Sequence, residues 1–439
     1  MESIFNLQEK YPVDESIISF ETYAYEPISG TQYNNPGQIT IRIENTDAFF
    51  YPRRSWLQVE GNLIKGGTAG GAYTAAEVIT IVNNAILYLF DNIRYDLSGQ
   101  EIESLFNPGQ ATTMLGLAKY SSNFNSGVGL NQGWRIDSGD GKASLTTNSG
   151  FTERHAYFIK NPDPKGSFRL AIDLEHIFGF MEDYDKILYG FTQSLTLVRA
   201  ASSNDAIFRT DQAYLNANAA VVDGVVKLSR IAWFMPKVTP SDVEKYELYK
   251  KINAQITLDV GFRMRQCSTI SMPAAQTYTW RLGVRSAPEE PRYIMLAFQT
   301  DRANNQEKNT AVFDHCRLKN AYVLLNNVRY PAIDFNASFT KNQYENFYKD
   351  FAEFSRKYYG IDWLVTSTAV DSISYKAHHP IFIFDVSKQS ERLQQGVVDI
   401  AIEMFFAANV TPATVAFALL ISDRKLKFKS DGKKMTVIH

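Results

Sequence analysis

Two segments of this chain repeat one pattern at a constant distance along the sequence. Residues 38–59 align without a gap on residues 277–298. Thr40-Ile41-Arg42-Ile43 falls on Thr279-Trp280-Arg281-Leu282, and Pro52-Arg53 and Leu57 fall on Pro291-Arg292 and Leu296. We call this matching pair of segments the first anchor of the repeat. A second anchor follows in both halves: Asn84-Ala85 and Asn92-Ile93-Arg94-Tyr95 match Asn320-Ala321 and Asn327-Val328-Arg329-Tyr330. Anchors repeated in one order predict an internal duplication, which restricts the fold to two similar units in tandem.

Length and composition agree with two β-rich units. A chain of 439 residues is too long for one ordinary core and suits two domains of about 200 residues each. Aromatic residues make up 13% of the chain, which favours half-buried pleated sheets over a helical bundle. A net charge of −2 argues against a protein that coats nucleic acid over its whole surface. Two cysteines, Cys267 and Cys316, cannot build a disulfide framework and suit a reducing compartment.

Short segments of alternating hydrophobicity predict about eight strands in each half. In the first half they are residues 18–25, 38–43, 55–63, 85–95, 168–174, 194–199 and 225–234. In the second half they are residues 255–263, 278–282, 293–300, 321–330, 381–386, 398–406 and 413–420. This number is typical of a two-sheet jelly roll, although alternation alone also fits other sandwiches. The predicted fold class is therefore all-β, with two tandem eight-stranded jelly-roll sandwiches and one or two short helices in each.

Each half also carries one helical pattern, soon after its second anchor. Thr340-Lys341-Asn342-Gln343 has the form of a capping box. Aromatic residues then recur at helical spacing, and Gly360 supplies a left-handed stop; the aromatic residues are Tyr344, Phe347, Tyr348, Phe351, Phe354 and Tyr358. Residues 108–120 occupy the equivalent place in the first half and predict a weaker helix, because they contain glycine and threonine.

The boundary between the halves is predicted near Pro236. Pro236 and Pro240 fall within a stretch of five residues, which is expected to end a sheet interior. Ser241-Asp242-Val243-Glu244 predicts a helix cap. The predicted units are a first jelly roll over 1–235, a connector over 236–252 and a second jelly roll over 253–439. Three small-residue-rich loops decorate the first unit, at 66–77, 121–150 and 200–224, and we expect functional surface there.

Candidate chemical sites are few, and we predict no catalytic, cofactor-binding or metal-binding residue. The six histidines, none of which has a zinc-ligand spacing, are His155, His176, His315, His378, His379 and His439. Glu175-His176 and His378-His379 are the suggestive clusters, with a hydrogen-bonded or exposed histidine as the simpler interpretation. Asp137-Ser138-Gly139-Asp140-Gly141 resembles part of a calcium loop but lacks the distal glutamate, so a polar turn is favoured.

The chain also shows no targeting pattern that would place it in a membrane. Its first ten residues lack the basic and apolar regions of a secretory signal, and no stretch approaches the ~20 apolar residues that span a bilayer. We therefore expect neither a signal peptide nor a transmembrane segment.

Residues 422–439 carry six basic side chains against two acidic ones. This segment could contact packaged DNA or an anionic membrane. The alternative is a solvated terminal hairpin in which Leu426 and Phe428 point inward and the lysines outward, and this alternative is favoured.

Taken with the duplication, the junction resembles that of a known family. Trp233, Pro236, Val238, Pro240 and Ser241 form a Trp-x-x-Pro-x-Val-x-Pro-Ser pattern. The arrangement resembles the double jelly-roll major capsid proteins of adenoviruses, tectiviruses and large DNA viruses, and most of all those of virophages, adintoviruses and Polinton-type virus-like elements. The resemblance covers residues from about 16 to 421.

The resemblance implies a structural protein of the virion. Its expected partners are copies of itself, in a homotrimeric capsomer of nearly hexagonal outline that tiles an icosahedral shell, together with minor capsid or penton proteins. Two alternatives remain open from the residues alone. One is a minor capsid, receptor-binding or carbohydrate-binding tandem sandwich, which exposed loop aromatics such as Trp134 would favour. The other is a glycosidase-type enzyme, for which no motif was found.

Overall fold

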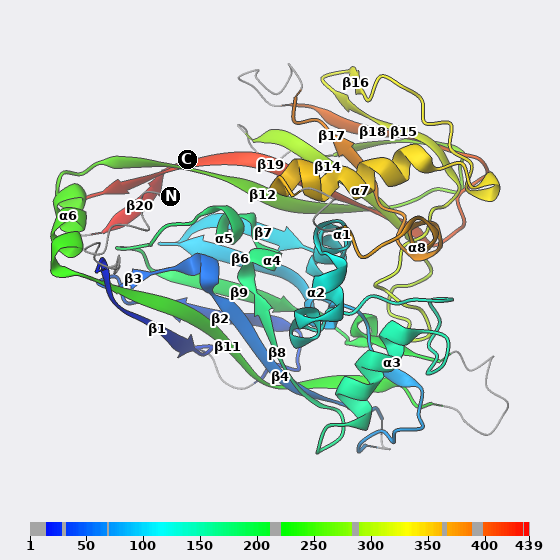
Figure 1. Cartoon of the computed structure of the whole chain (residues 1–439), viewed down its shortest axis with the longest axis horizontal. Coiled ribbons are helices and arrows are strands. Elements are labelled where there is room, and N and C mark those ends of the chain that lie inside the picture. Colours follow the sequence, from blue (N-terminus) through cyan, green and yellow to red (C-terminus); the bar gives the residue numbers. More distant parts are fainter. Residues whose placement is uncertain are drawn as a thin grey trace, which may run out of the picture.

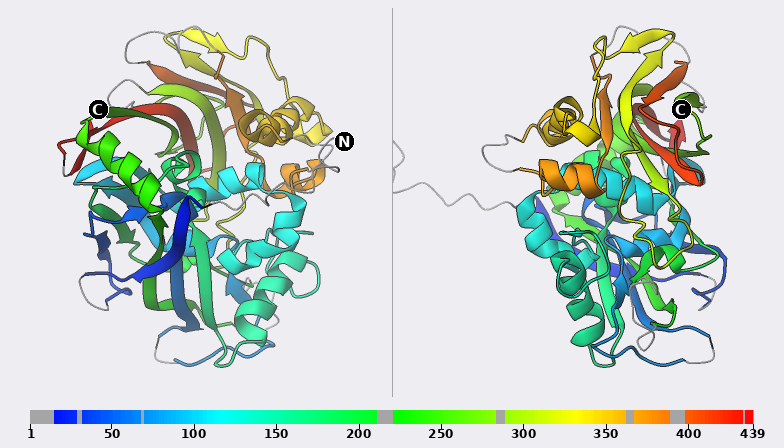
Figure 2. Two further views of the ribbon diagram at one scale, coloured as in Figure 1. Left: turned by 60° about the vertical axis from the view of Figure 1, so that its left-hand side comes forward. Right: turned by 90° about the vertical axis from the view of Figure 1, so that its right-hand side faces the viewer.

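The structure, a computed structural model, places two β-sandwiches on either side of one connecting helix. It describes residues 15–28, 32–67, 70–210, 221–282, 289–361, 367–388, 398–432 and 434–438. Helix α6 (Asp242–Asn253) joins the halves at one end of the molecule, as Figure 1 shows. Figure 2 shows the second half lying over the first, with α6 along one side.

The first half contains two four-stranded antiparallel sheets. One has the order β1-β11-β4-β8, with β3 (Phe49–Phe50) added beside β11, and the other has the order β2-β9-β6-β7. The strands of the first sheet are β1 (Ile17–Tyr25), β4 (Trp56–Lys65), β8 (Ser167–Asp173) and β11 (Gly224–Pro240). Those of the second are β2 (Gly37–Ile43), β6 (Phe90–Leu97), β7 (Gln100–Phe106) and β9 (Gln193–Arg199). A small additional sheet pairs β5 (Ile79–Ile81) with β10 (Ile207–Arg209).

The second half repeats this arrangement. Its sheets have the orders β12-β19-β14-β17 and β13-β18-β15-β16, and β20 (Met435–Ile438) adds to the outer end of β19. The first sheet is built from β12 (Thr257–Ser271), β14 (Glu290–Thr300), β17 (Phe382–Asp385) and β19 (Thr414–Ser430). The second is built from β13 (Thr277–Leu282), β15 (Leu318–Leu325), β16 (Val328–Tyr330) and β18 (Ile400–Phe406).

The two halves therefore share one topology, strand for strand in chain order. β12 takes the place of β1, β14 that of β4, and β19 that of β11, and the other sheet corresponds in the same way. Eight strands in two sheets with this order form a jelly roll. The predicted duplication and the predicted fold class are confirmed.

Only part of the sequence alignment that suggested the duplication corresponds in space. β2 and β13 hold equivalent positions, as the first anchor predicted. Pro52-Arg53 lies in a 3₁₀ turn, η2 (Pro52–Arg54), whereas Pro291-Arg292 lies inside β14. The second anchor was wrong, because it matched β6 with β16 although the counterpart of β6 is β15. The connection from β4 to β6 holds β5 and the turn η3 (Ala85–Leu89), so the spacing differs between the halves.

The two predicted helices are present in equivalent connections. Helix α1 (Pro108–Lys119) follows β7, and α7 (Glu345–Tyr359) follows β16. Phe347, Phe351, Phe354 and Tyr358 form the buried face of α7, and Gly360 ends the helix at a φ of 70°, as predicted. The predicted capping box was wrong: residues Phe339–Lys341 form a 3₁₀ turn, and α7 begins after Tyr344 without a side-chain cap.

The first half carries more helices than the one or two that were predicted. Besides α1 they are α2 (Ser122–Ser126), α3 (Ser149–His155), α4 (Leu174–Ile177) and α5 (Gly179–Asp183), while the second half adds α8 (Ser372–His378) to α7. Segment 121–150, predicted as a projecting loop, folds back through α2 and the turn η4 (Val128–Gln132). Its Trp134, considered as an exposed aromatic, is only 1% exposed and packs on Gly116 of α1.

The other two predicted loops are partly structured. Segment 200–224 contains the turn η6 (Asn204–Ala206) and β10, and its residues 211–220 lie outside the described residues. Segment 66–77 is irregular where it is described, and it buries the ring of Tyr73.

The predicted end of the sheet at Pro236 was wrong, because β11 continues through both prolines to Pro240. Pro236 lacks an amide hydrogen, yet its carbonyl oxygen still accepts a hydrogen bond from Tyr51 N at 2.9 Å. Pro240 is the last residue of the strand, where a missing donor costs little. Helix α6 then begins as predicted, with the Ser241 hydroxyl accepting from Glu244 N. The limits of the two jelly rolls, 1–235 and 253–439, remain a proposal.

The end of the described chain is the predicted hairpin of β19 and β20. Leu426 and Phe428 are buried, whereas Lys425, Lys427 and Lys429 are exposed. The hairpin also contacts the first half, since Met435 N donates to Gly190 O at 3.0 Å. One continuous hydrophobic core joins the two sandwiches. No helix among the described residues is long and apolar enough to cross a membrane.

Candidate functional site

The feature that sets this chain apart from two independent sandwiches is the contact between its halves, which we call the seam. In the seam, α1, α5 and β7 of the first half pack against β12 and α7 of the second. The α1 and α7 ribbons lie side by side at the middle of the molecule in Figure 1. Charged side chains are buried within this apolar contact, so its geometry depends on how those charges are paired.

A buried carboxylate, Glu182 of α5, lies at the centre of the seam. It accepts hydrogen bonds from Lys119 Nζ at 2.6 Å and from Arg265 Nη2 of β12 at 2.5 Å. Tyr359 OH of α7 donates to it at 2.9 Å. Burial alone would raise the pKa of Glu182, but Arg265 and Lys119 outweigh it and hold the pKa at about 2. The carboxylate is therefore ionised at neutral pH and ties three segments from both halves together.

Arg265 is the matching buried cation. Its side chain is 1% exposed, and its Nη1 donates to the carbonyl oxygens of Glu175 and His176 at 3.0 and 2.8 Å. Arg265 follows the predicted strand 255–263 and lies on the face of β12 opposite to Phe262 and Met264. Its hydrogen-bond acceptors belong to the first half, which explains why no pattern within β12 revealed its role.

A second buried carboxylate, Glu103 of β7, accepts only backbone donors. Its two oxygens accept from Gly179 N, Phe180 N and Arg265 N at 3.1, 2.9 and 2.8 Å. Burial raises the pKa of Glu103 to about 7, despite Arg265 and the backbone donors, which lower it. Glu103 thus links β7, α5 and β12 while remaining partly protonated near neutral pH.

This raised pKa predicts a stability that falls as pH rises. The unfolded chain releases the Glu103 proton near 4.5, whereas the folded chain keeps it up to about 7. The unfolded state therefore binds fewer protons between these values, and stability falls across pH 4.5 to 7 by about 3 kcal/mol and then levels. We expect Glu103→Gln to remove this slope when the urea midpoint is measured against pH. Glu101→Gln, at an exposed position of the same strand, should keep the slope; an unchanged slope in Glu103→Gln would contradict the assignment.

A second ion pair closes the seam beside Glu182. Arg263 of β12 forms a salt bridge with Asp183 of α5, and the Arg263 backbone N also donates to Asp183 at 2.8 Å. The guanidinium stacks on the Tyr358 ring of α7, with its carbon 3.8 Å from the ring centre. Charge pairing and cation–π contact act together here, so β12 is held by both α5 and α7.

Gly179 permits the close approach of α5 to β12. A Cβ atom at this position would overlap the carbonyl oxygen of Arg263. We expect Gly179→Ala to separate the halves locally and to lower the free energy of unfolding by about 2–4 kcal/mol. Gly261→Ala is the matched control within β12, because its Cβ would meet only Arg424 O at 4.0 Å. Equal denaturation midpoints for the two variants would show that the approach at Gly179 is not tight.

The halves are also bound at the end opposite α6. Asp137, from the predicted polar turn, is 3% exposed and pairs with Arg154 Nη2 at 2.7 Å. Its other oxygen accepts from Asn309 Nδ2 of the second half at 2.8 Å. Gln306 bonds both the amide and the carbonyl of Gly224 at 2.8 Å. The Asp137 segment therefore serves as a structural link between the halves.

The described histidines occupy structural positions. His176 is buried and shares a hydrogen bond of 2.9 Å between its Nδ1 and Tyr120 OH, and burial, with Lys119 and Arg265, holds its pKa well below the usual value. His378 donates to Gly139 O at 3.1 Å, while burial, with His378 nearby, lowers the pKa of His379 to about 3. His155 and His315 contact Glu77 O and the Phe339 ring, and His439 lies outside the described residues. Within the described residues no group of three His, Cys, Asp or Glu side chains could hold a metal ion.

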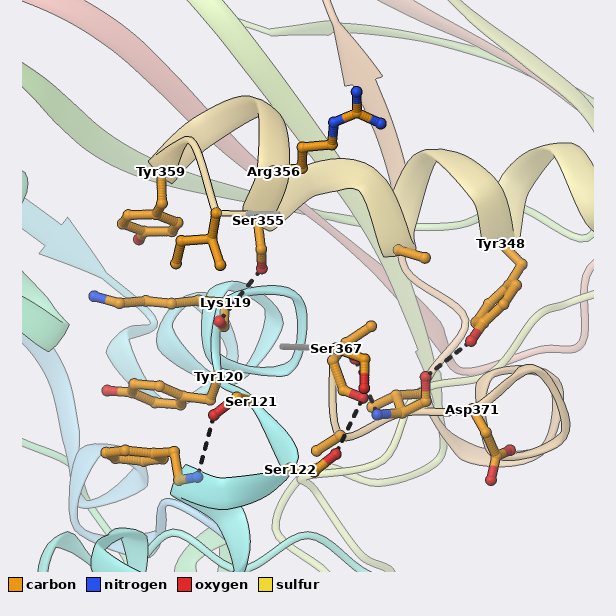
Figure 3. Close-up of a pocket in the computed structure, with 16 residues that line it drawn as sticks. Lys119, Tyr120, Ser121, Ser122, Tyr348, Ser355, Arg356, Tyr359, Ser367 and Asp371 are labelled. Carbon is orange, nitrogen blue, oxygen red and sulfur yellow. Dashed lines mark hydrogen bonds between the residues drawn. The ribbon is translucent and has the colours of Figure 1, made fainter. Parts of the chain in front are cut away.

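One surface pocket opens along the seam, between the end of α1 and α7 (Figure 3). Ser355 Oγ donates across it to Ala118 O at 2.6 Å, and Tyr348 OH donates to Val370 O at 3.2 Å. Lys119, which lines it, is paired with Glu182. Tyr359, which also lines it, donates its hydroxyl to Glu182, and no histidine stands among the lining residues. We therefore interpret the pocket as a space left between the packed halves.

An uncovered apolar strand face distinguishes the first half from the second. Exposed apolar side chains lie on both sides of β1, and we call this edge the β1 face; the exposed fractions are 45% for Ile17, 66% for Ile18, 47% for Phe20 and 43% for Tyr23. The counterpart strand β12 is covered in its middle by α5 and β7 of the first half. A row of exposed apolar residues on an edge strand marks a surface for association.

The comparisons with known proteins agree with this architecture. The model of the double jelly roll-like domain family matches residues 79–426, which is more than half of the chain. No curated protein sequence matches the chain.

Solved structures with this fold cover nearly the whole chain. The Faustovirus major capsid protein is 8% identical, covers 96% of this chain and 92% of its own, and gives a TM-score of 0.58. The mavirus major capsid protein is 12% identical over 99% of this chain and 92% of its own, with a TM-score of 0.56. The Sputnik virophage structure is 12% identical in sequence and gives a TM-score of 0.54. The match covers 99% of this chain and 91% of the Sputnik chain. At such low identity these likenesses show the fold alone.

Proposed function

Because this chain belongs to the double jelly roll-like domain family, we propose that it is the major capsid protein of a virus. Three copies form a capsomer of nearly hexagonal outline, and capsomers tile an icosahedral shell. The observation that supports this most is the repeated topology within one chain. Two equal sandwiches, fixed to each other by a buried charged seam, give a rigid unit that supplies two of six similar positions around an axis.

The uncovered β1 face supports a closed ring of three chains. Inside one chain, the β7 side of the first half covers β12 of the second half. If the same kind of contact recurs between chains, the β16 side of one copy covers β1 of the next, since β16 is the counterpart of β7. That side is also apolar and exposed, at Val328 (43%) and Ile333 (60%). Such a head-to-tail contact closes after three chains and six sandwiches.

The size of the purified particle tests the proposal. We expect light scattering at micromolar concentration to give the mass of three chains, because obligate interfaces of this kind bury well above ~2,000 Å². Negative-stain images should show six-sided particles or shells. A stable monomer in both measurements would overturn the proposal, with compact particles favouring an enzyme and elongated ones a receptor-binding or carbohydrate-binding component.

The proposal also fixes location and partners. The chain resides in the capsid of the virion and acts without catalytic residues, through burial of apolar surface between copies. Its partners are other copies of itself, within and between capsomers, and minor capsid or penton proteins that fill positions a six-sided unit cannot occupy.

A weak contact with packaged DNA or an anionic membrane is the last part of the proposal. This contact would involve the exposed lysines of β19. Truncation of the hairpin is a poor test, because it would also remove Phe428, whose ring centre lies 4.8 Å from that of Phe191 in the first half. We instead expect Lys425→Gln with Lys427→Gln and Lys429→Gln to lower the slope of log affinity for duplex DNA against log salt by about 3. The control changes Lys319, Lys341 and Lys349, exposed lysines of the same half, to Gln. Equal slopes would leave the hairpin with a structural role only.

A further inference from the structure

An apolar groove lies beside α6, apart from the seam and the β1 face. It has a volume of about 120 Å³. One wall comes from Leu248 and Ile252 of α6 and from Ile256 and Leu258 at the start of β12, and the other comes from the first half and the terminal hairpin, with Leu188, Phe191, Phe428 and Met435. A groove of this volume, lined mainly by aliphatic and aromatic groups, is large enough to hold one benzene-sized group.

Helix α6 lacks the cover that a helix of its length usually has. None of its residues is buried. Its contact with the first half is made by Tyr249, whose ring lies 6.1 Å from Phe49 and 5.6 Å from Tyr189. Ile256 and Leu258, which follow it, are 42% and 47% exposed. Tertiary packing usually stabilises a helix of this length, so the groove side of α6 needs an additional partner.

The chain places a suitable segment beside this groove. Ser16 O accepts a hydrogen bond from Ser241 N at 2.8 Å, directly before α6 begins. The described chain therefore begins beside the start of the helix that lines the groove, and residues 1–14 lie outside the described residues. From Ser241 to Ile252 is about 16 Å along a helix, and five or six residues of extended chain span about 20 Å. Residues 4–7 can thus reach the groove without strain.

The chemistry of that segment matches the groove. Ile4, Phe5 and Leu7 are apolar and close together. Residues 1–14 contain three acidic side chains and one lysine, whereas Lys251 lines the groove and the exposed Lys429 lies next to the lining residues Phe428 and Ser430. Apolar anchors within a complementary charged rim are the usual features of a peptide-binding groove.

We propose that residues 1–14 dock in this groove of their own chain, with Ile4, Phe5 and Leu7 covering Leu248, Ile252 and Leu258. The segment then clamps α6 against the terminal hairpin and fixes the connection between the two halves. The occupant is the same chain and not a second copy, because the segment starts next to the groove that it fills. The inference does not depend on assembly into a shell.

Disulfide formation distinguishes docking of the segment in its own chain from docking of the segment of a second copy. We expect Leu7→Cys with Ile256→Cys, under mild oxidation, to form an intrachain disulfide at least about tenfold faster than Leu7→Cys with Ile373→Cys. Ile373 is the control because it is 79% exposed and lies on α8, at the other end of the molecule in Figure 1. Equal rates would overturn the proposal. A covalent dimer on a non-reducing gel would overturn it in favour of a second copy.

Hydrogen exchange tests the same proposal without cysteines. In the full chain, Ile4→Ser with Phe5→Ser and Leu7→Ser should speed amide exchange at residues 248–252 by about tenfold, because the end of α6 loses its cover. Changing Asn6 and Gln8, two uncharged polar residues of the same segment, to Ser should leave exchange unchanged. Unaltered protection in the first variant would overturn the proposal even if the particle size were that of a trimer.

Discussion

Replacing Arg265 by Ala should lower the free energy of unfolding by about 3–5 kcal/mol. The main cause is that buried polar groups lose their hydrogen-bond partners, and the loss of the ion-pair attraction itself is the smaller part. Glu182 would keep a buried negative charge with only Lys119 and tyrosine hydroxyls as donors, and the carbonyl oxygens of Glu175 and His176 would lose their partner. Breaking one side of a buried pair has this magnitude.

Urea denaturation followed by intrinsic fluorescence measures this effect. Arg230→Ala is the matched control, because Arg230 bridges Glu26 and Glu60 on the outer face of a sheet with 37% of its side chain exposed. A pair at that exposure contributes about 1 kcal/mol or less. If the two variants lost equal stability, the seam charges would not hold the halves together.

Charged substitutions on the β1 face should prevent association while leaving each chain folded. Ile18→Asp with Phe20→Asp places two carboxylates in the proposed contact between copies, where each would lose its hydration without gaining a partner. Each buried, unpaired charge costs several kcal/mol, so the dissociation constant of the trimer should rise at least about 1,000-fold. The side chains are 66% and 47% exposed in the single chain, so its own stability should change little.

Sedimentation velocity reads out the oligomer, and circular dichroism confirms the fold. Val243→Asp is the control, since Val243 is 74% exposed on α6 and lies outside the β1 face. The expected result is a monomer for the β1 variant and a trimer for the control. A trimer in both cases would place the contact between copies elsewhere on the molecule.

The parts of the fold that local chemistry determines were accessible from the sequence. Alternation located most of the strands, but it missed β7 and joined β15 and β16 into one segment. The aromatic period of α7 marked its buried side. The cap at Ser241 and the stop at Gly360 were predicted for the same reason, since each is a contact between residues near in sequence. The second anchor failed because a four-residue match cannot distinguish two neighbouring strands of one sheet.

The seam was not accessible, because its residues acquire their roles from the other half. Nothing close in sequence to Glu103 or Arg265 indicates that β7 and β12 meet. Trp134 was misjudged for a related reason, since its cover is Gly116 of α1 and the ring of Tyr120. The sequence predicted that the sheet ends at Pro236 and Pro240, because proline has no amide hydrogen to donate. The sequence alone does not show that no acceptor in the sheet requires a hydrogen bond from these two positions.

The contact between Met435 and Gly190 has a consequence for biosynthesis. Translation proceeds at about 5–20 residues per second, so Gly190 waits for roughly 10–50 s before its partner leaves the ribosome. During that interval the nascent first sandwich lacks the closing strand pair at this edge. The first sandwich is therefore completed at this edge only after nearly the whole chain has been synthesised.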